Sequence, residues 1–168
     1  MLAVLGLAWL ARAEPHPTLP WLGAQLVPSP QVAIGAGAVH FGVRWQLTPL
    51  LFAWGVNRKV SGWRTFVVEP FVRHGGAVEF FVSPELLFTE QPAVLLRPGL
   101  RAYFPVLEHG EALSVSAGLS YQRIGAIDGV ALEVGAFILF GILGLQVSWA
   151  PGPQTAGQTI VTLRLRYF

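Results

Sequence analysis

Alternation of apolar and polar residues, repeated in separate segments, constrains the fold of this chain more than any other feature. Residues 39–47 show the pattern clearly, because Val39, Phe41, Val43, Trp45 and Leu47 are separated by smaller or polar residues. Successive side chains of a β-strand point to opposite faces, so a period of two predicts a strand with one apolar face. The same period recurs in residues 78–88, 94–104, 113–122, 143–149 and 159–168.

The composition points to a membrane environment. The chain is 53% hydrophobic and only 12% charged, whereas soluble domains carry about 25% charged residues. The apolar residues are divided by 19 glycines and 13 prolines into short runs, which suits a single-domain transmembrane β-barrel better than a helical bundle. The absence of cysteine excludes disulfides and thiol chemistry, and a net charge of +2 gives no reason to expect a nucleic-acid partner.

The charged residues decide which face of the strands is inside. A soluble barrel would cover its exterior with lysine and glutamate, but Lys59 is the only lysine. Arginine on the lipid face near the membrane midplane costs about 2–4 kcal/mol, so the mid-strand charges should line the lumen and form Arg–Glu pairs. The predicted lumen charge network consists of Arg44, Glu69, Arg73, Glu79, Glu85, Arg97, Arg101, Glu133, Arg164 and Arg166.

Glycine and proline mark the expected turns. The candidate turns are residues 27–30, 48–49, 57–62, 74–76, 89–92, 105–111, 125–129, 140–141 and 151–157. They leave nine strands and a weaker one at residues 19–27. Bacterial barrels have an even number of strands, so we expect a closed, antiparallel, up-and-down barrel of ten strands. Eight strands remain possible if residues 19–27 form a leader and one adjacent pair merges.

The last segment carries a resemblance. Leu163, Leu165 and Tyr167 alternate with polar residues before the terminal Phe168. This strand resembles the final strand of integral outer-membrane β-barrels of Gram-negative bacteria, which ends in phenylalanine and serves as an assembly signal. Here the apolar residues are in phase with Tyr167 rather than Phe168. The resemblance implies an outer-membrane location, and it implies lipid, the barrel-insertion machinery and periplasmic chaperones as partners.

The N-terminal residues suggest export. Residues 1–10 are apolar, and Ala11-Arg12-Ala13 has the small-x-small pattern of a signal-peptidase site, although no basic residue precedes Arg12. The predicted organisation is a signal peptide at 1–13, a leader with a possible first strand at 14–30, and the barrel at 31–168. A buried N-terminal helix is the alternative for the first segment.

Aromatic residues are expected at the two membrane surfaces, where their amphipathic rings are half hydrated. The predicted girdle, near strand ends, consists of Trp21, Trp45, Trp54, Trp63, Trp149 and Tyr167.

Three prolines lie inside predicted strands, on the lipid face: Pro70, Pro84 and Pro98. With a turn centred on Gln91, Pro84 and Pro98 would lie opposite one another and form a poorly bonded lateral seam. This device is similar to one in the outer-membrane lipid A palmitoyltransferase family, which thins its interstrand bonding with prolines to admit a lipid. The similarity covers no catalytic residue, and a bulge that shapes the barrel is the alternative.

No catalytic or metal-binding pattern is apparent. Of the histidines, only His40 is predicted to face the lumen, and the His-x-Ser motif of lipid A deacylases does not follow it. We therefore expect a small structural or interaction barrel of the cell envelope that needs no cofactor and is not an enzyme. A porin-like narrow pore or a lateral conduit for lipid or small solutes is the first alternative, and a lipid-modifying enzyme is the second. Residues 129–150 would also fit one transmembrane helix.

Overall fold

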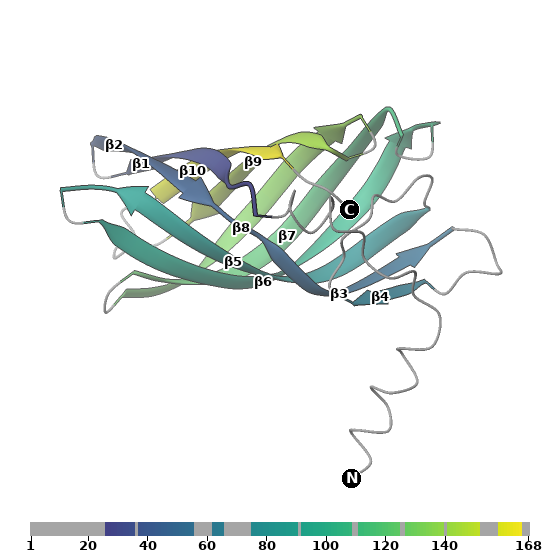
Figure 1. Ribbon diagram of the computed structural model, residues 1–168, viewed down its shortest axis with the longest axis horizontal. Coiled ribbons are helices and arrows are strands. Elements are labelled where there is room, and N and C mark those ends of the chain that lie inside the picture. Colours follow the sequence, from purple (N-terminus) through teal and green to yellow (C-terminus); the bar gives the residue numbers. More distant parts are fainter. Residues whose placement is uncertain are drawn as a thin grey trace, which may run out of the picture.

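The computed structural model describes residues 26–35, 37–55, 62–65, 75–90, 92–108, 111–124, 127–139, 141–151 and 158–165. They form one antiparallel sheet of ten strands that curls into a barrel (Figure 1). The strands are β1 (Ser29–Gly35), β2 (Ala38–Arg44), β3 (Leu47–Trp54), β4 (Trp63–Thr65), β5 (Gly76–Phe88), β6 (Ala93–Leu107), β7 (Leu113–Ile124), β8 (Ile127–Ile138), β9 (Leu143–Ala150) and β10 (Gln158–Leu165).

The barrel closes with eight strands, not the ten that we preferred from the sequence. β2 pairs with residues 85–88 of β5, and β3 pairs with residues 76–82 of the same strand. β2 and β3 therefore occupy one position in the ring, which runs β1, β10, β9, β8, β7, β6, β5 and back through β2. β4 is an additional strand that pairs with β3. The predicted alternative of eight strands has the right number, and β2 and β3 share one position in the ring. The turn that separates β1 from β2 was not predicted, and most of the leader expected at residues 19–27 lies outside the described residues.

The turn predicted at Thr48 and Pro49 is wrong, because both residues lie in β3. The chain bends at Trp45 and Gln46 between β2 and β3, and the register against β5 shifts between Leu47 and Leu50. Such a bulge frees a residue from the ladder, so a proline can stand there without removing a needed donor. Pro49 therefore marks an irregular part of β3 and not the end of a strand.

Other connections are shorter than the sequence predicted. β6 continues through a second irregularity between Pro105 and Leu107, β8 starts at Ile127, and β1 starts at Ser29. Two ends of the barrel can be named from these connections. The β1–β2 end also carries the β5–β6, β7–β8 and β9–β10 turns, while the β4 end carries the β6–β7 and β8–β9 connections (Figure 1).

Residues 129–150, considered above as one helix, form most of β8 and all of β9, which pair with each other. Within the described part of the chain, no helix is long and apolar enough to span a membrane.

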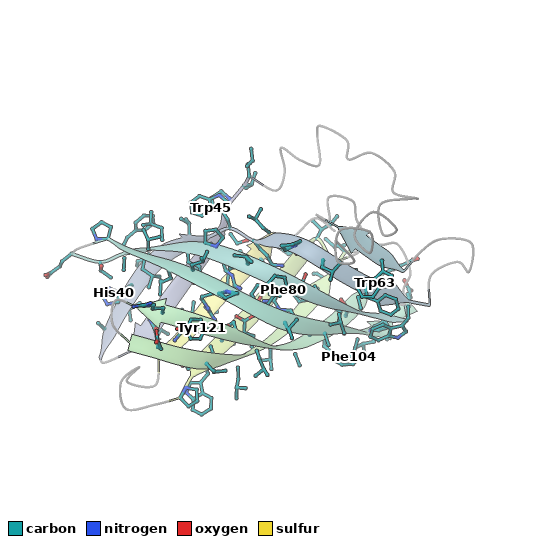
Figure 2. The ribbon with its side chains drawn as sticks, turned by 90° about the horizontal axis from the view of Figure 1, so that it is seen from below. His40, Trp45, Trp63, Phe80, Phe104 and Tyr121 are labelled. Atoms are coloured by element: carbon teal, nitrogen blue, oxygen red, sulfur yellow. The ribbon has the colours of Figure 1, made fainter. Side chains whose placement is uncertain are left out.

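The alternation of the sequence separates the two faces of the wall. On β5, Ala77, Glu79, Phe81, Ser83, Glu85 and Leu87 are all buried in the lumen. Between them, Val78 and Phe80 point outward and remain about two-fifths exposed, at 40% and 39%. Figure 2 shows the same arrangement around the barrel, with side chains projecting from the outer surface. The polar face is thus the interior, as the charge pattern predicted.

Candidate functional site

The lumen of the barrel holds the candidate site, a network of buried charges. The predicted members that the structure describes are all buried there: Arg44, Glu79, Glu85, Arg97, Arg101, Glu133 and Arg164. Glu69, Arg73 and Arg166 lie outside the described residues. The inward faces of five strands, β2, β5, β6, β8 and β10, contribute these groups, so the network joins opposite sides of the wall.

Glu133 on β8 is the central carboxylate. It accepts a hydrogen bond of 2.8 Å from Nη2 of Arg97 and another from Nη2 of Arg101. Ser120 and Gln146 each donate a further bond of 2.8 Å, from β7 and β9. Charge-assisted hydrogen bonds are about twice as strong as neutral ones, so this one carboxylate ties four strands together.

Two further carboxylates on β5 complete the ion pairs. Glu85 lies 3.3 Å from Nε of Arg44 and 3.3 Å from Nη1 of Arg97, so it bridges the strands on either side of its own. Glu79 accepts bonds of 3.0 Å from Arg101 and 2.8 Å from the hydroxyl of Tyr103. The network therefore extends along the barrel axis as well as across it.

Arg164 is held differently, by amide groups. Its Nη1 donates 2.6 Å to Oε1 of Gln146, and its Nη2 donates to Oε1 of Gln46. The same Gln46 oxygen also accepts a bond of 3.1 Å from Arg101. The two glutamines thus connect Arg164 to the rest of the network by hydrogen bonds. No carboxylate of the described residues forms an ion pair with Arg164.

An aromatic ring separates the charged groups. Phe81 projects inward from β5 between Glu79 and Ser83, with the guanidinium of Arg101 4.3 Å and that of Arg44 5.6 Å from its ring centroid. A cation over an aromatic face is attracted by the ring quadrupole. Phe81 therefore fills the middle of the lumen while stabilising two arginines.

Inward-facing glycines make room for these large side chains. A Cβ on Gly99 would lie 2.4 Å from the ring of Phe81, and one on Gly144 would lie 2.3 Å from the ring of Phe137. On Gly118, between Arg101 and Glu133 in the register, a Cβ would lie 3.1 Å from the Arg101 Cβ. The interior of an eight-stranded barrel is just wide enough to be filled by side chains, so alternating large and very small residues packs it.

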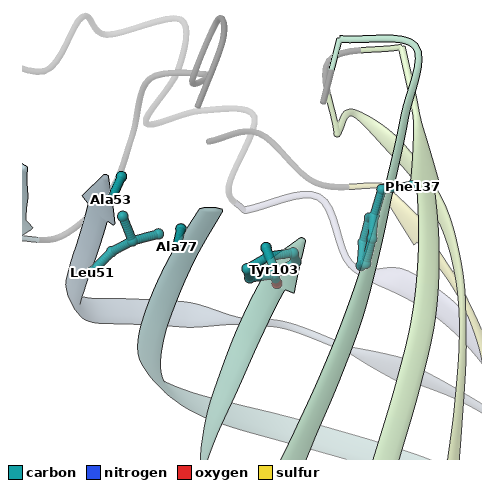
Figure 3. Packing of buried hydrophobic residues seen from close by; sticks show 5 residues of the cluster. All are labelled: Leu51, Ala53, Ala77, Tyr103 and Phe137. Carbon is teal, nitrogen blue, oxygen red and sulfur yellow. The ribbon is translucent and has the colours of Figure 1, made fainter. Parts of the chain in front are cut away.

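Apolar layers lie at both ends of the charged network. Toward the β1–β2 end, the layer consists of Ala33, Leu87, Leu95 and Ile160. Toward the β4 end it consists of Leu51, Ala53, Ala77, Tyr103 and Phe137 (Figure 3). The rings of Tyr103 and Phe137 meet edge to face with centroids 5.5 Å apart. The interior therefore has three layers, with the charges in the middle.

The premise of the predicted proline seam is wrong. Pro84 lies opposite Leu96 and Pro98 opposite Val82, and the β5–β6 register is continuous from Ala77 to Leu87. The hairpin is centred on Glu90, one residue earlier than assumed, so the two prolines are not opposite each other. The third proline, Pro70, lies outside the described residues.

The missing donor of Pro84 faces another seam. The carbonyl of Pro84 accepts a 2.9 Å hydrogen bond from the backbone N–H of Trp45. In a strand the N–H and C=O of one residue point to the same side, so the nitrogen of Pro84 faces the β2–β3 bend. The donor that Pro84 lacks is therefore missing from the β2–β3 side, where the wall is already irregular, and not from the β5–β6 ladder.

The aromatic residues form two groups on the exterior. Trp54 and Trp63 contact Phe52 near the β4 end, with centroid separations of 6.3 and 4.8 Å, whereas Tyr121 and Trp149 lie near the β1–β2 end. Figure 2 shows Trp63 and Tyr121 toward opposite ends. Trp45 was predicted near a membrane surface, but it lies at the β2–β3 bend, in the middle of that wall. Its Nε1 donates a hydrogen bond of 3.0 Å to the carbonyl of Leu26. Trp21 and Tyr167 lie outside the described residues.

Sequence reasoning missed the neutral members of the network. These are Gln31, Gln46, Thr48, Ser83, Tyr103, Ser120 and Gln146. The signal was present, because most of them share the inward parity of the arginines and glutamates on their strands. Their partners lie far away in sequence, however, so only the folded barrel identifies them.

Candidate catalytic and metal-binding groups are not brought together. His40 lies opposite the buried Ala33 and is half-buried near the β1–β2 end, apart from the ion pairs. Among the described residues, no group of three or more histidine, aspartate or glutamate side chains could hold a metal ion. Of the predicted assembly signal, Leu163 is exposed on the outer face; the side chain of Leu165 is not described, and Phe168 lies outside the described residues.

The chain matches no protein-family model, no curated protein and no solved structure.

Proposed function

We propose that this protein is an integral β-barrel of a bacterial outer membrane, with a structural or interaction role and no catalytic activity. The observation that carries the proposal is the sorting of charge. Wherever the structure describes a charged side chain, it is either in the lumen network or near a turn. The second set comprises Glu90, Glu108, Glu111, Arg123 and Asp128.

The outer surface between the turns supports a lipid environment. Leu100, Leu119 and Leu132 are neighbours on β6, β7 and β8 and are 58%, 53% and 45% exposed. Monomeric soluble proteins rarely expose contiguous apolar patches larger than a few hundred Å². An outward apolar band is what the outer face of a transmembrane barrel requires.

The dimensions agree with a membrane span on the longer wall. β5, β6, β7 and β8 contain 13, 15, 12 and 12 residues, and a tilted transmembrane strand needs about 9–11. The two aromatic groups lie near opposite ends of these strands, where the headgroup regions would be. Outer-membrane lipid, the insertion machinery and periplasmic chaperones are then the expected partners.

The filled interior favours a structural or interaction role over transport. The described lumen contains three successive layers of buried side chains, of which the outer two are apolar. An ion would have to displace an apolar layer at each end. We therefore expect negligible conductance in planar bilayers, and a steady anion-selective current would support the narrow-pore alternative instead.

Location is tested by expressing the full chain in a Gram-negative host and separating the membranes. We expect the protein in the outer-membrane fraction, resistant to extraction at high pH, with a gel mobility that changes on heating. Recovery in the soluble fraction as a folded β-protein would contradict the proposal.

A lateral conduit at the bend between β2 and β3 is the second candidate. Pro84 withholds a donor from this seam, and the register shift between Leu47 and Leu50 lies beside it. Val43 and Leu86 are paired across the seam. A disulfide between cysteines at these two positions should block lipid entry if the seam opens. Unchanged lipid uptake in the locked protein would exclude this route.

A further inference from the structure

The buried charges of the described lumen do not balance. Arg44, Arg97, Arg101 and Arg164 are opposed by Glu79, Glu85 and Glu133, and all seven are at most 2% exposed. Arginine cannot be deprotonated in proteins, and an unpaired charge in a dry interior costs several kcal/mol. One positive charge in this set therefore requires a counter-charge.

Arg44 shows where the deficit falls. Its Nε donates 2.7 Å to Ser83 and lies 3.3 Å from Glu85. Both terminal nitrogens, Nη1 and Nη2, are buried without a hydrogen-bond partner among the described residues. The nearest carboxylate to Nη2 is that of Glu133, at 3.6 Å, which already accepts bonds from two other arginines.

Arg164 is the second cation of interest, because no carboxylate of the described residues forms an ion pair with it. Its guanidinium is bonded to amide oxygens only, and Arg44 and Arg101 lie close enough for their charges to repel it. The register brings Arg44 and Arg164 to either side of one residue. Ser29 lies opposite Arg44 of β2. The β1–β10 pairing ends with Gln31 opposite Thr162, and continuing it by two residues along each strand brings Arg164 beside Ser29.

We propose that the lumen binds one small monovalent inorganic anion of the halide class beside Arg44, with Arg164 as the second cation of the site. The terminal nitrogens of Arg44 supply hydrogen-bond donors, and the excess charge supplies the attraction. The tight packing of the lumen selects a monatomic anion over an organic one. This site depends on the barrel fold and not on the membrane location.

The test compares thermal unfolding of the full chain, folded in a zwitterionic detergent, in sodium chloride or bromide and in sodium gluconate at equal ionic strength. Gluconate is too large for the site. Since a ligand that binds only the folded state stabilises it, we expect the midpoint to be about 3 °C higher in the halides. Equal midpoints in all three salts would overturn the proposal.

Placing a fixed negative charge in the site separates this effect from general salt effects. The substitution Ser29→Asp should raise the midpoint in gluconate and remove the difference between salts. Ser148→Asp is the matched control, since Ser148 is also buried but faces Glu133 and Ile160 in the register; it should lower the midpoint and retain the halide effect. A halide effect that persists in Ser29→Asp would contradict the site.

Two further variants keep the test decisive if Ser29→Asp does not fold. Arg164→Gln removes the excess cation, so the midpoint should become independent of the anion without falling in gluconate. Glu69 is predicted to face the lumen, so its carboxylate could supply the counter-charge in place of a bound anion. If the wild type shows no halide effect and Glu69→Gln acquires one, the protein supplies its own anion and the proposal is wrong.

Discussion

The carboxylate of Glu133 shows how single residues hold this barrel together. Arg97 and Arg101 both donate to it. Their other carboxylate partners, Glu85 and Glu79, also bind other members of the network. A buried ion pair adds little net stability compared with apolar packing, but removal of one partner leaves a buried charge uncompensated. Stability should therefore depend on the balance of charges more than on any one contact.

Glu133→Gln removes a negative charge while keeping the side-chain shape. We expect the free energy of unfolding to fall by about 3–5 kcal/mol, because two buried arginines lose their shared counter-charge. Urea titration of the detergent-folded protein measures it. Glu90→Gln, at the exposed β5–β6 turn, is the control and should change stability by less than about 0.5 kcal/mol. Equal effects at the two positions would contradict a buried network.

Gly144 tests the packing of large against very small residues. A Cβ there would lie 2.3 Å from Cδ1 of Phe137 and 3.0 Å from the carbonyl oxygen of Ala136. Gly144→Ala should cost about 1–3 kcal/mol through overpacking. Because the closest atoms belong to the Phe137 ring, Phe137→Leu should recover part of this loss. Additive losses in the double variant would show that the ring does not cause the strain.

At the scale of elements, β5 organises the barrel. It pairs with β6 on one side and with both β2 and β3 on the other, and its inward face carries two of the carboxylates. Its hairpin with β6 sets the register, and a shift by one residue would move every side chain of the strand to the other face. The position of the turn at Glu90 therefore determines whether Glu79 and Glu85 reach the lumen.

Disulfide trapping checks this register, since the chain has no native cysteine. Pro84 and Leu96 are directly opposite, as a non-hydrogen-bonded pair with Cα atoms about 4.5 Å apart, which suits a disulfide. Cysteines at 84 and 96 should cross-link on mild oxidation. Cysteines at 84 and 98 lie diagonally and should not. The reverse result would restore the hairpin centred on Gln91.

At the scale of the whole molecule, the barrel is an inverted globule, with charges inside and apolar side chains outside. Its interior replaces a conventional hydrophobic core with a charged layer between two apolar ones. An apolar exterior of this kind is expected to be more stable in lipid than in water, and this is the physical basis for the proposed membrane location.

Leu119→Arg tests that location energetically. Leu119 lies near the middle of β7 and is 53% exposed. Folding into lipid vesicles should be weakened by about 2–4 kcal/mol. Leu139→Arg, at a residue 58% exposed but in the β8–β9 turn, should cost only about 0–1 kcal/mol, as at an interface. Indifference to charge at position 119 would argue against a lipid-facing wall.

Much of this architecture was predictable from local pattern. The period of two identified most of the strands, and the parity of arginine and glutamate identified the inward face, because both depend only on the alternation of side chains along a strand. Prolines misled the prediction at residue 49, where a bulge tolerates proline, and at residues 84 and 98, where a hairpin register one residue different separates them.

The sequence by itself determined that the chain forms amphipathic strands and which side chains share a face, since these properties are local. Only the tertiary structure decided that eight strands close the ring, that β2 and β3 form one wall, and that Arg44 lies opposite Ser29. Ring closure and side-chain bonding across the lumen join residues far apart in the chain, such as Gln46 and Arg164. Their partners are fixed by register and curvature, which no local pattern specifies.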